Sequence, residues 1–171
     1  KTRNWRVFLI EKRCDIIKIM NTKTFIFIGK SGCGKGTQLK FLQDYLSKKD
    51  TNIKIESVVM GEIFRDFFKE EGYVQDIARD ISMNQGKFQP DFLTNALFVR
   101  NAINIIDQDS CLFFDGYPRN INQLEIIKSL LSYAKRENCS VLDIQVSNES
   151  VKKRMFGRKR EDDSESAIAN R

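Results

Sequence analysis

The stretch GKSGCGKGTQ (Gly29–Gln38) follows directly on the apolar run FIFI (Phe25–Ile28), and the two together decide the fold. They fit the phosphate-binding pattern G-x-x-x-x-G-K-[ST] up to Lys35, but Gly36 comes next and the hydroxyl arrives one residue late, at Thr37. Glycines let main-chain amides approach a polyphosphate closely, the lysine adds positive charge, and a following helix adds its positive N-terminal end. The stretch therefore predicts a buried strand, a phosphate-binding loop and a helix, in that order.

Further apolar runs and helical patterns alternate along the chain. The predicted strands are residues 24–29, 53–59, 111–115 and 141–146. The first predicted helix begins at about residue 35, with Leu39, Leu42, Tyr45 and Leu46 on its inner face. Two short helices are predicted within residues 61–85, with a break near Gly72, and the next has Pro90 in its first turn and runs to about residue 106. A further helix is predicted over residues 120–137, and another begins near the end of the chain. Alternation of this kind predicts an α/β fold, a parallel sheet with helices on both faces and ligands at the carboxyl ends of the strands.

Composition limits the classes of protein that fit. A length of 171 residues, 41% hydrophobic and 30% charged, suits one soluble globular domain. The net charge of +6 is compatible with nucleic acid, anionic lipid or small phosphorylated ligands. The absence of histidine excludes imidazole acid–base catalysis and histidine–metal ligation. The cysteines are widely spaced without a C-x-x-C pair, which argues against zinc and favours a reducing compartment, and no apolar run approaches the roughly 18 residues of a membrane span.

The first 19 residues are basic and contain only short apolar runs. The longest of these runs, VFLI (Val7–Ile10), is too short for a signal peptide. Met20 stands a few residues before the first predicted strand and is a candidate for the natural start. Residues 1–19 are therefore interpreted as an extension of unknown role, either a targeting segment or a segment that is not native.

Two motifs resemble those of a known enzyme family. The run GKSGCGKGTQ resembles the phosphate loop of nucleoside monophosphate kinases, in which Gly-Thr follows the lysine, and DGYPRNINQ (Asp115–Gln123) is similar to the corresponding stretch of adenylate kinases. The resemblance covers roughly residues 22–171 and implies a P-loop NTPase-like fold with reversible, Mg²⁺-dependent transfer of the γ-phosphoryl group of ATP to AMP, giving two ADP. The stretch PRN (Pro118–Asn120) also resembles UMP/CMP kinases, and a catalytically weak nucleotide-binding module is a further alternative.

The resemblance implies roles for residues around the phosphates. Asp115 would hold Mg²⁺ through water, and the displaced Thr37 would bond a phosphate or a metal-bound water. ATP binding falls to Gly29, Ser31, Gly32, Cys33, Gly34, Lys35, Gly36, Thr37, Arg154 and Arg158. Catalysis, by neutralising charge on the transferred phosphoryl group, falls to Lys35, Arg119, Arg158, Arg160 and Arg171.

The acceptor side is assigned in the same way. Arg65 would present a forked donor to the phosphate of AMP, Gln123 would read its base, and Met60 stands where adenylate kinases usually have threonine. AMP binding therefore falls to Met60, Gly61, Arg65, Lys87, Gln89, Gly116, Arg119 and Gln123, with Phe88 and Pro90 as packing residues.

The same resemblance divides the chain. Residues 20–171 would form the kinase domain, with a monophosphate-binding segment at about 57–86 and a short lid at about 154–163, and with the last helix and strand of the family missing. We expect a monomer that binds ATP and a nucleoside monophosphate without nucleic-acid or membrane partners. It would be cytoplasmic, or organellar if residues 1–19 are a targeting segment. A solvated face that touches RNA is the alternative reading of the basic run KKRMFGRKR (residues 152–160).

Overall fold

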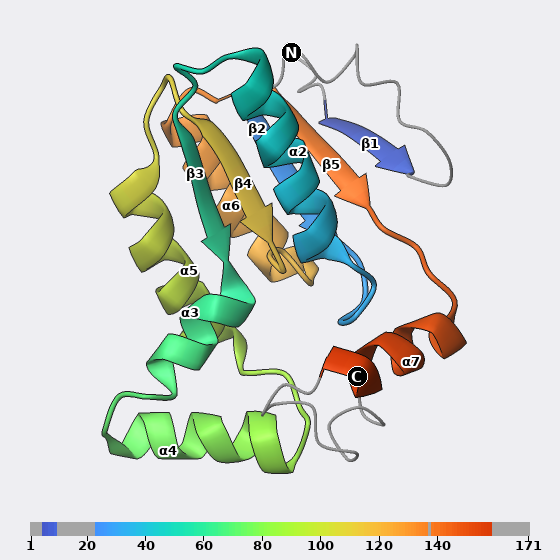
Figure 1. Ribbon diagram of the computed structural model, residues 1–171. Helices are drawn as coiled ribbons and strands as arrows, with labels where there is room; N and C mark the ends of the chain where they lie inside the picture. Colours follow the sequence, from blue (N-terminus) through green and yellow to red (C-terminus); the bar gives the residue numbers. More distant parts are fainter. Residues whose placement is uncertain (1–4, 10–22, 137, 159–171) are drawn as a thin grey trace.

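The computed structural model describes residues 5–9, 23–136 and 138–158. They form a five-stranded sheet in the order β1-β5-β2-β4-β3, in which every neighbouring pair is parallel (Figure 1). The strands are β1 (Trp5–Leu9), β2 (Thr24–Ile28), β3 (Ile55–Val59), β4 (Cys111–Asp115) and β5 (Cys139–Asp143). The predicted α/β fold with a parallel sheet is confirmed.

Helices connect the strands and extend beyond their carboxyl ends. They are α2 (Lys35–Lys49), α3 (Met60–Phe67), α4 (Tyr73–Arg79) continuing as the π-helical turn η1 (Asp80–Asn84), α5 (Asp91–Ile105), α6 (Ile121–Tyr133) and α7 (Asn148–Arg158). The predicted break near Gly72 is confirmed, because Gly72 directly precedes α4 with a φ of 150°. Pro90 precedes α5 rather than lying in its first turn, since its ψ of 150° is not helical.

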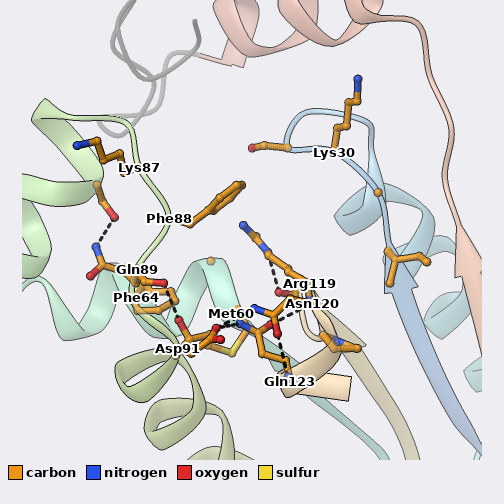
Figure 2. Close-up of a pocket in the computed structure, with 18 of the residues that line it drawn as sticks. Lys30, Met60, Phe64, Lys87, Phe88, Gln89, Asp91, Arg119, Asn120 and Gln123 are labelled. Carbon is orange, nitrogen blue, oxygen red and sulfur yellow. Dashed lines mark hydrogen bonds between the residues drawn. The ribbon is translucent and has the colours of Figure 1, made fainter. Parts of the chain in front are cut away.

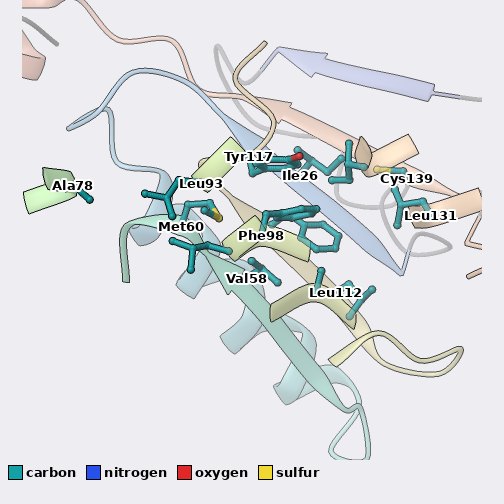
Figure 3. Packing of buried hydrophobic residues seen from close by; sticks show 14 of the residues in the cluster. Ile26, Val58, Met60, Ala78, Leu93, Phe98, Leu112, Tyr117, Leu131 and Cys139 are labelled. Carbon is teal, nitrogen blue, oxygen red and sulfur yellow. The ribbon is translucent and has the colours of Figure 1, made fainter. Parts of the chain in front are cut away.

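The apolar strands bury both of their faces, as the continuous apolar runs predict. Ile26, Leu112 and Phe114 point to one side, where they pack with residues of α3, α5 and α6 (Figure 3). Phe25, Phe27 and Phe113 point to the other side, and α2 and α7 cover them. Burial of each such side chain contributes about 1.5–3 kcal/mol to the stability of the fold.

Several details of the fold differ from the sequence prediction. Tyr45, expected on the inner face of α2, is 40% exposed, while Leu39 on the same helix is buried. The last predicted strand begins and ends earlier, at Cys139–Asp143, because its register is set by pairing with β2 from Thr24 onward. The strand β1 lies within the segment of unknown role and pairs with β5 at the edge of the sheet. Pairing between segments so far apart in the chain cannot be recognised from the sequence of either segment alone.

The buried guanidinium of Arg136 joins the amino-terminal ends of β2 and β4. It donates to Thr24 Oγ1 at 3.0 Å, to the carbonyl oxygens of Lys23 and Ser110 at 2.7 Å each, and to the carbonyl of Asp107. Only 8% of this residue is exposed. The guanidinium therefore gives donors to the carbonyl oxygens of Asp107 and Ser110 and a second donor to that of Lys23, which also accepts from the main-chain N–H of Leu112, at the end of the sheet away from the glycine loop.

Arg136→Ala is expected to lower the free energy of unfolding by about 2–4 kcal/mol, because several buried acceptors each lose a hydrogen-bond donor at once. Urea denaturation followed by circular dichroism measures this loss. Arg100→Ala, at an exposed arginine on α5, serves as the control and is expected to change stability by less than about 0.5 kcal/mol. Equal stability of the two variants would contradict the role given to Arg136.

Candidate active site

The glycine loop turns tightly between β2 and α2. Gly29, Gly32 and Gly34 have φ values of 134°, 78° and 103°, a region that residues with a side chain rarely adopt. A Cβ at Gly29 would lie 2.6 Å from the carbonyl oxygen of Ile144, which is main chain and cannot move aside easily. The loop therefore requires glycine both for its conformation and for its close approach to the segment after β5.

Lys35, the first residue of α2, reaches back over this loop. Its Nζ donates to the carbonyl oxygens of Gly29 and Lys30, both at 2.9 Å. The ammonium is thus held against the same turn whose amides and helix end favour an anion. This arrangement matches the phosphate-binding loop predicted from the sequence.

Helix α7 packs against the glycine loop. Arg154 Nη1 donates to the carbonyl of Cys33 at 2.8 Å, and Lys30 Nζ donates to Asn148 Oδ1 at 2.5 Å. A Cβ at Gly32 would lie 2.6 Å from Met155 Cγ. Arg154, which was predicted to bind ATP together with the glycine loop, is therefore already in contact with that loop.

A cavity of about 720 Å³ opens beside the loop, at the carboxyl ends of β2, β3 and β4 (Figure 2). The glycine loop contributes Gly29 and Ser31 to its lining. Every residue predicted to contact AMP also lines it: Met60, Gly61, Arg65, Lys87, Gln89, Gly116, Arg119 and Gln123. The fold thus brings together residues from stretches that lie far apart in the sequence.

The lining of the cavity carries an excess of positive charge. Lys30, Arg65, Lys87 and Arg119 contribute cations, and Asp91 contributes the only carboxylate among the described residues that line it. Positive groups that line a cleft with apolar walls concentrate anionic ligands. Phosphorylated ligands are therefore the class that the site suits.

Arg119 lies between a main-chain oxygen and an aromatic ring. Its Nε donates to the carbonyl of Gly116 at 2.9 Å, and its Cζ lies 4.8 Å from the centroid of the Phe88 ring. Phe88 is 61% exposed and lines the cavity, so it does not pack into the core. The ring instead supports the guanidinium through a cation–π contact.

Gln123 is almost fully buried, with 3% of its surface exposed. Its side-chain amide contacts the main-chain N–H of Arg119 and the carboxylate of Asp91. The reading of a base by Gln123 stays a prediction. Its partner Asp91 is not among the residues predicted from the sequence, because it stands at the end of the stretch GKFQPD (residues 86–91) with no spacing that points to residue 123.

Lys30 and Asn120 also line the cavity without having been predicted from the sequence. Asn120 precedes α6, and its Oδ1 accepts from the main-chain N–H of Gln123 at 3.0 Å. This capping preference of asparagine is a signal that could have identified it. Lys30 lies inside the glycine loop, but the x positions of the motif carry no residue preference.

Asp115 closes β4 beside the first turn of α2. It is 9% exposed, and its Oδ2 lies 4.0 Å from the position of a Cβ at Gly36. Within the described ranges, no group of three or more His, Cys, Asp or Glu side chains is placed to hold a metal ion. The carboxylate of Asp115 fits Mg²⁺, which prefers oxygen ligands and retains several waters or substrate phosphates, and Thr37, the residue after Gly36, carries a second oxygen ligand of that kind.

Some predicted residues are not placed. The side chain of Arg158 and all of Arg160 and Arg171 lie outside the described residues, as does most of the predicted lid. The structure therefore brings together the residues predicted to bind the acceptor, and it places Arg154 in contact with the glycine loop. For the helices that it describes, none combines the length and the apolar character that crossing a membrane requires.

Comparison of the sequence with known proteins identifies a family that matches this chain. Residues 27–171 match the family model described as adenylate kinase. The chain is 30% identical over 152 residues to the adenylate kinase of Oenococcus oeni, a match that covers 88% of this chain and 76% of that protein. It is also 32% identical to the adenylate kinase of a Mycobacterium species (85% and 76% covered) and 33% identical to that of Leuconostoc mesenteroides (87% and 75% covered).

Gly29→Ala is expected to destabilise the protein by about 1–3 kcal/mol and to weaken nucleotide binding, because the new methyl group meets the Ile144 carbonyl and φ becomes unfavourable. Gly157→Ala is the matched control, since nothing lies within 4 Å of its Cβ position in α7. This control should gain about 0.5–1 kcal/mol from helix propensity. Thermal unfolding with and without ATP checks both variants; a Gly29→Ala protein as stable as the Gly157→Ala protein would contradict the argument.

Proposed function

This chain belongs to the adenylate kinase family, and we propose that it transfers the γ-phosphoryl group of ATP to AMP, with Mg²⁺ bound, to give two ADP. The family makes it a phosphotransferase that acts on nucleoside monophosphates. The choice of AMP, the use of Mg²⁺ and the role of each residue are the proposed parts.

The observation that carries the proposal is the shared cavity. Gly29, Lys30 and Ser31, which begin the loop that would bind the donor phosphates, line one space rich in cations together with the residues predicted to bind the acceptor. Phosphoryl transfer requires mainly that donor and acceptor be aligned and that charge on the transferred group be neutralised. A cavity with these two sides is what that reaction needs.

Each cation has a place in this scheme. Lys35, already held at the loop, would neutralise the donor phosphates, and Arg65 would bind the acceptor phosphate. Arg119, exposed beside the cavity, would contact the acceptor phosphate and the transferred group. Arg158, Arg160 and Arg171 remain proposed catalytic residues. The monophosphate-binding segment at about 57–86 and the short lid at about 154–163 remain proposed divisions of the chain.

Asp115 and Thr37 are the residues proposed to hold Mg²⁺, through water. When bound, Mg²⁺ supplies charge neutralisation at the phosphates. Asp115 contributes a nearly buried carboxylate at the carboxyl end of β4. Three buried free thiols, Cys33, Cys111 and Cys139, support our further proposal that the protein works in a reducing compartment such as the cytoplasm.

An assay of ADP formation from ATP with AMP, CMP, UMP or GMP tests the proposal. Fastest turnover with AMP supports it. Preference for a pyrimidine monophosphate would transfer the assignment to UMP/CMP kinases. Saturable nucleotide binding without turnover would identify a nucleotide-binding module instead.

Lys35→Met is expected to lower kcat by at least about 100-fold, because one preorganised donor to the phosphates is lost. Lys40→Met, at an exposed lysine of the same helix, is the matched control and should retain normal kcat. Thermal unfolding of both variants verifies that the fold is kept. Near-normal turnover by a folded Lys35→Met protein would exclude the proposed role.

Asp115→Asn is expected to raise the Mg²⁺ concentration for half-maximal activity by about 10- to 100-fold, the range typical of residues that bind a metal through a second layer of contacts. The neutral amide keeps the shape of the side chain but removes the charge that attracts the cation. Titration of activity with MgCl₂ at saturating nucleotide measures the change. An unaltered Mg²⁺ dependence would remove Asp115 from the metal site.

A further inference from the structure

The carboxylate of Asp91 is the hub of a hydrogen-bond network that the roles above do not use. Asp91 is the first residue of α5, and its oxygens accept from Asn120 Nδ2 at 2.9 Å, from Gln123 Nε2 at 2.8 Å and, at the 3.5 Å limit, from Asn122 Nδ2. The network joins the segment that follows Gly86 to the turn that carries Arg119, and Figure 2 shows it at the floor of the cavity. Asp91 therefore acts on Gln123 directly.

The two partners of Gln123 fix which way its amide faces. A carboxylate only accepts hydrogen bonds, so Asp91 requires the NH₂ group of Gln123. A main-chain N–H only donates, so Arg119 requires the oxygen, and its N lies 2.8 Å from Gln123 Oε1. The hydrogen bonds from Asn120 and Gln123 also hold the pKa of the Asp91 carboxyl below its usual value, which keeps it an acceptor at neutral pH. Rotation of the amide by 180° would break both bonds and turn oxygen toward a carboxylate.

A locked amide offers a ligand a fixed pattern. A primary amide has two hydrogens and two lone pairs, and Asp91 and Arg119 use one of each. What remains is one N–H donor beside one oxygen acceptor, in a fixed order, on a residue that lines the cavity. A glutamine whose amide can flip could place the donor and the acceptor in either arrangement, but Gln123 presents only one of the two arrangements.

Nucleobases fall into two classes by the same criterion. Adenine and cytosine carry an amino group next to a ring nitrogen that accepts, whereas guanine and uracil carry an oxygen next to a ring N–H that donates. The two patterns are opposite, so a locked amide pairs well with one class and leaves polar groups unpaired with the other. Sites that depend on such pairing discriminate strongly.

We propose that Asp91 is a positioning residue that locks the amide of Gln123 and thereby selects acceptors with an amino base, AMP and CMP, over those with an oxo base, GMP and UMP. The proposal rests on the proposed function in two ways: it takes Gln123 as the group that meets the base, and it takes AMP as the acceptor, which makes the amino bases the favoured class. The lock itself supplies the discrimination between the two classes. It adds that selectivity among acceptors is set by a residue that need not touch the acceptor.

The test compares acceptors that share a ring system, AMP with GMP and CMP with UMP, so that the difference in size between purines and pyrimidines has no influence on either ratio. Dissociation constants for AMP, GMP, CMP and UMP are measured by equilibrium dialysis, and kcat/KM with ATP in parallel, for the wild-type protein, Asp91→Ala and Asp91→Asn. Asp80→Ala is the matched control, because Asp80 holds two side-chain amides, Asn84 at 2.7 Å and Gln85 at 2.8 Å, without contacting Gln123.

The wild-type protein is expected to favour AMP over GMP and CMP over UMP. Asp91→Ala should reduce both ratios by about 10-fold or more, the factor for one hydrogen bond to a charged group. Asp91→Asn should fall between, since its oxygen can still accept from Gln123. Asp80→Ala should leave both ratios unchanged.

Two outcomes would overturn the proposal: a wild-type protein that binds the oxo bases more tightly, or a folded Asp91→Ala or Asp91→Asn protein that weakens all four acceptors equally. The second would mean that Asp91 only supports the fold. The proposed function fails separately, through absence of ADP formation with every acceptor, and in that event the binding ratios still decide the role of Asp91.

Discussion

Parallel pairing of β4 with both β2 and β3 is the constraint on which the site depends. Asp115 is level with Phe27 on one side and with Val59 on the other, so the three strands end side by side. Because their carboxyl ends face the same way, the segments that follow them, beginning near Gly29, Met60 and Gly116, meet around one cavity. A shift of one residue in either pairing would turn the buried phenylalanines to the wrong face as well as move these segments apart.

How far the sequence predicts this arrangement depends on the range of the interactions involved. The glycine loop and the break at Gly72 are local, because each depends on backbone conformations that glycine adopts easily. The grouping of the residues predicted to bind the acceptor around one cavity follows from the parallel sheet. The exposed position of Phe88 and the bond from Gln123 to Asp91 do not follow, since they join side chains whose neighbourhood is decided only when α5 and α6 pack. The position of β1 at the sheet edge likewise does not follow from the local sequence, because it depends on pairing with the distant strand β5.

The turn that carries Arg119 is anchored in the core by Tyr117, while the cation of Arg119 itself is exposed. Tyr117 is fully buried, stacks on Phe98 with ring centroids 3.6 Å apart, and donates its hydroxyl to Asn95 Oδ1 at 2.9 Å. Burial raises the pKa of Tyr117 above its usual value, so the hydroxyl remains a donor at physiological pH. The backbone is thus anchored in the core while the guanidinium two residues later stays at the surface, which separates the stability of the turn from the availability of its charge.

The contact between Arg154 and the Cys33 carbonyl has a consequence for the proposed role of Arg154 in binding ATP. The guanidinium already has a satisfied partner before any substrate arrives, so a nucleotide that draws it away exchanges one bond for another. The apparent dissociation constant of that nucleotide then reflects the difference in free energy between the arginine bound to the nucleotide and the arginine bound to the Cys33 carbonyl, rather than the full strength of the bond to the nucleotide. Affinity and specificity for the triphosphate become partly separable quantities, because the resting contact weakens the binding of every competitor for Arg154 by the same factor.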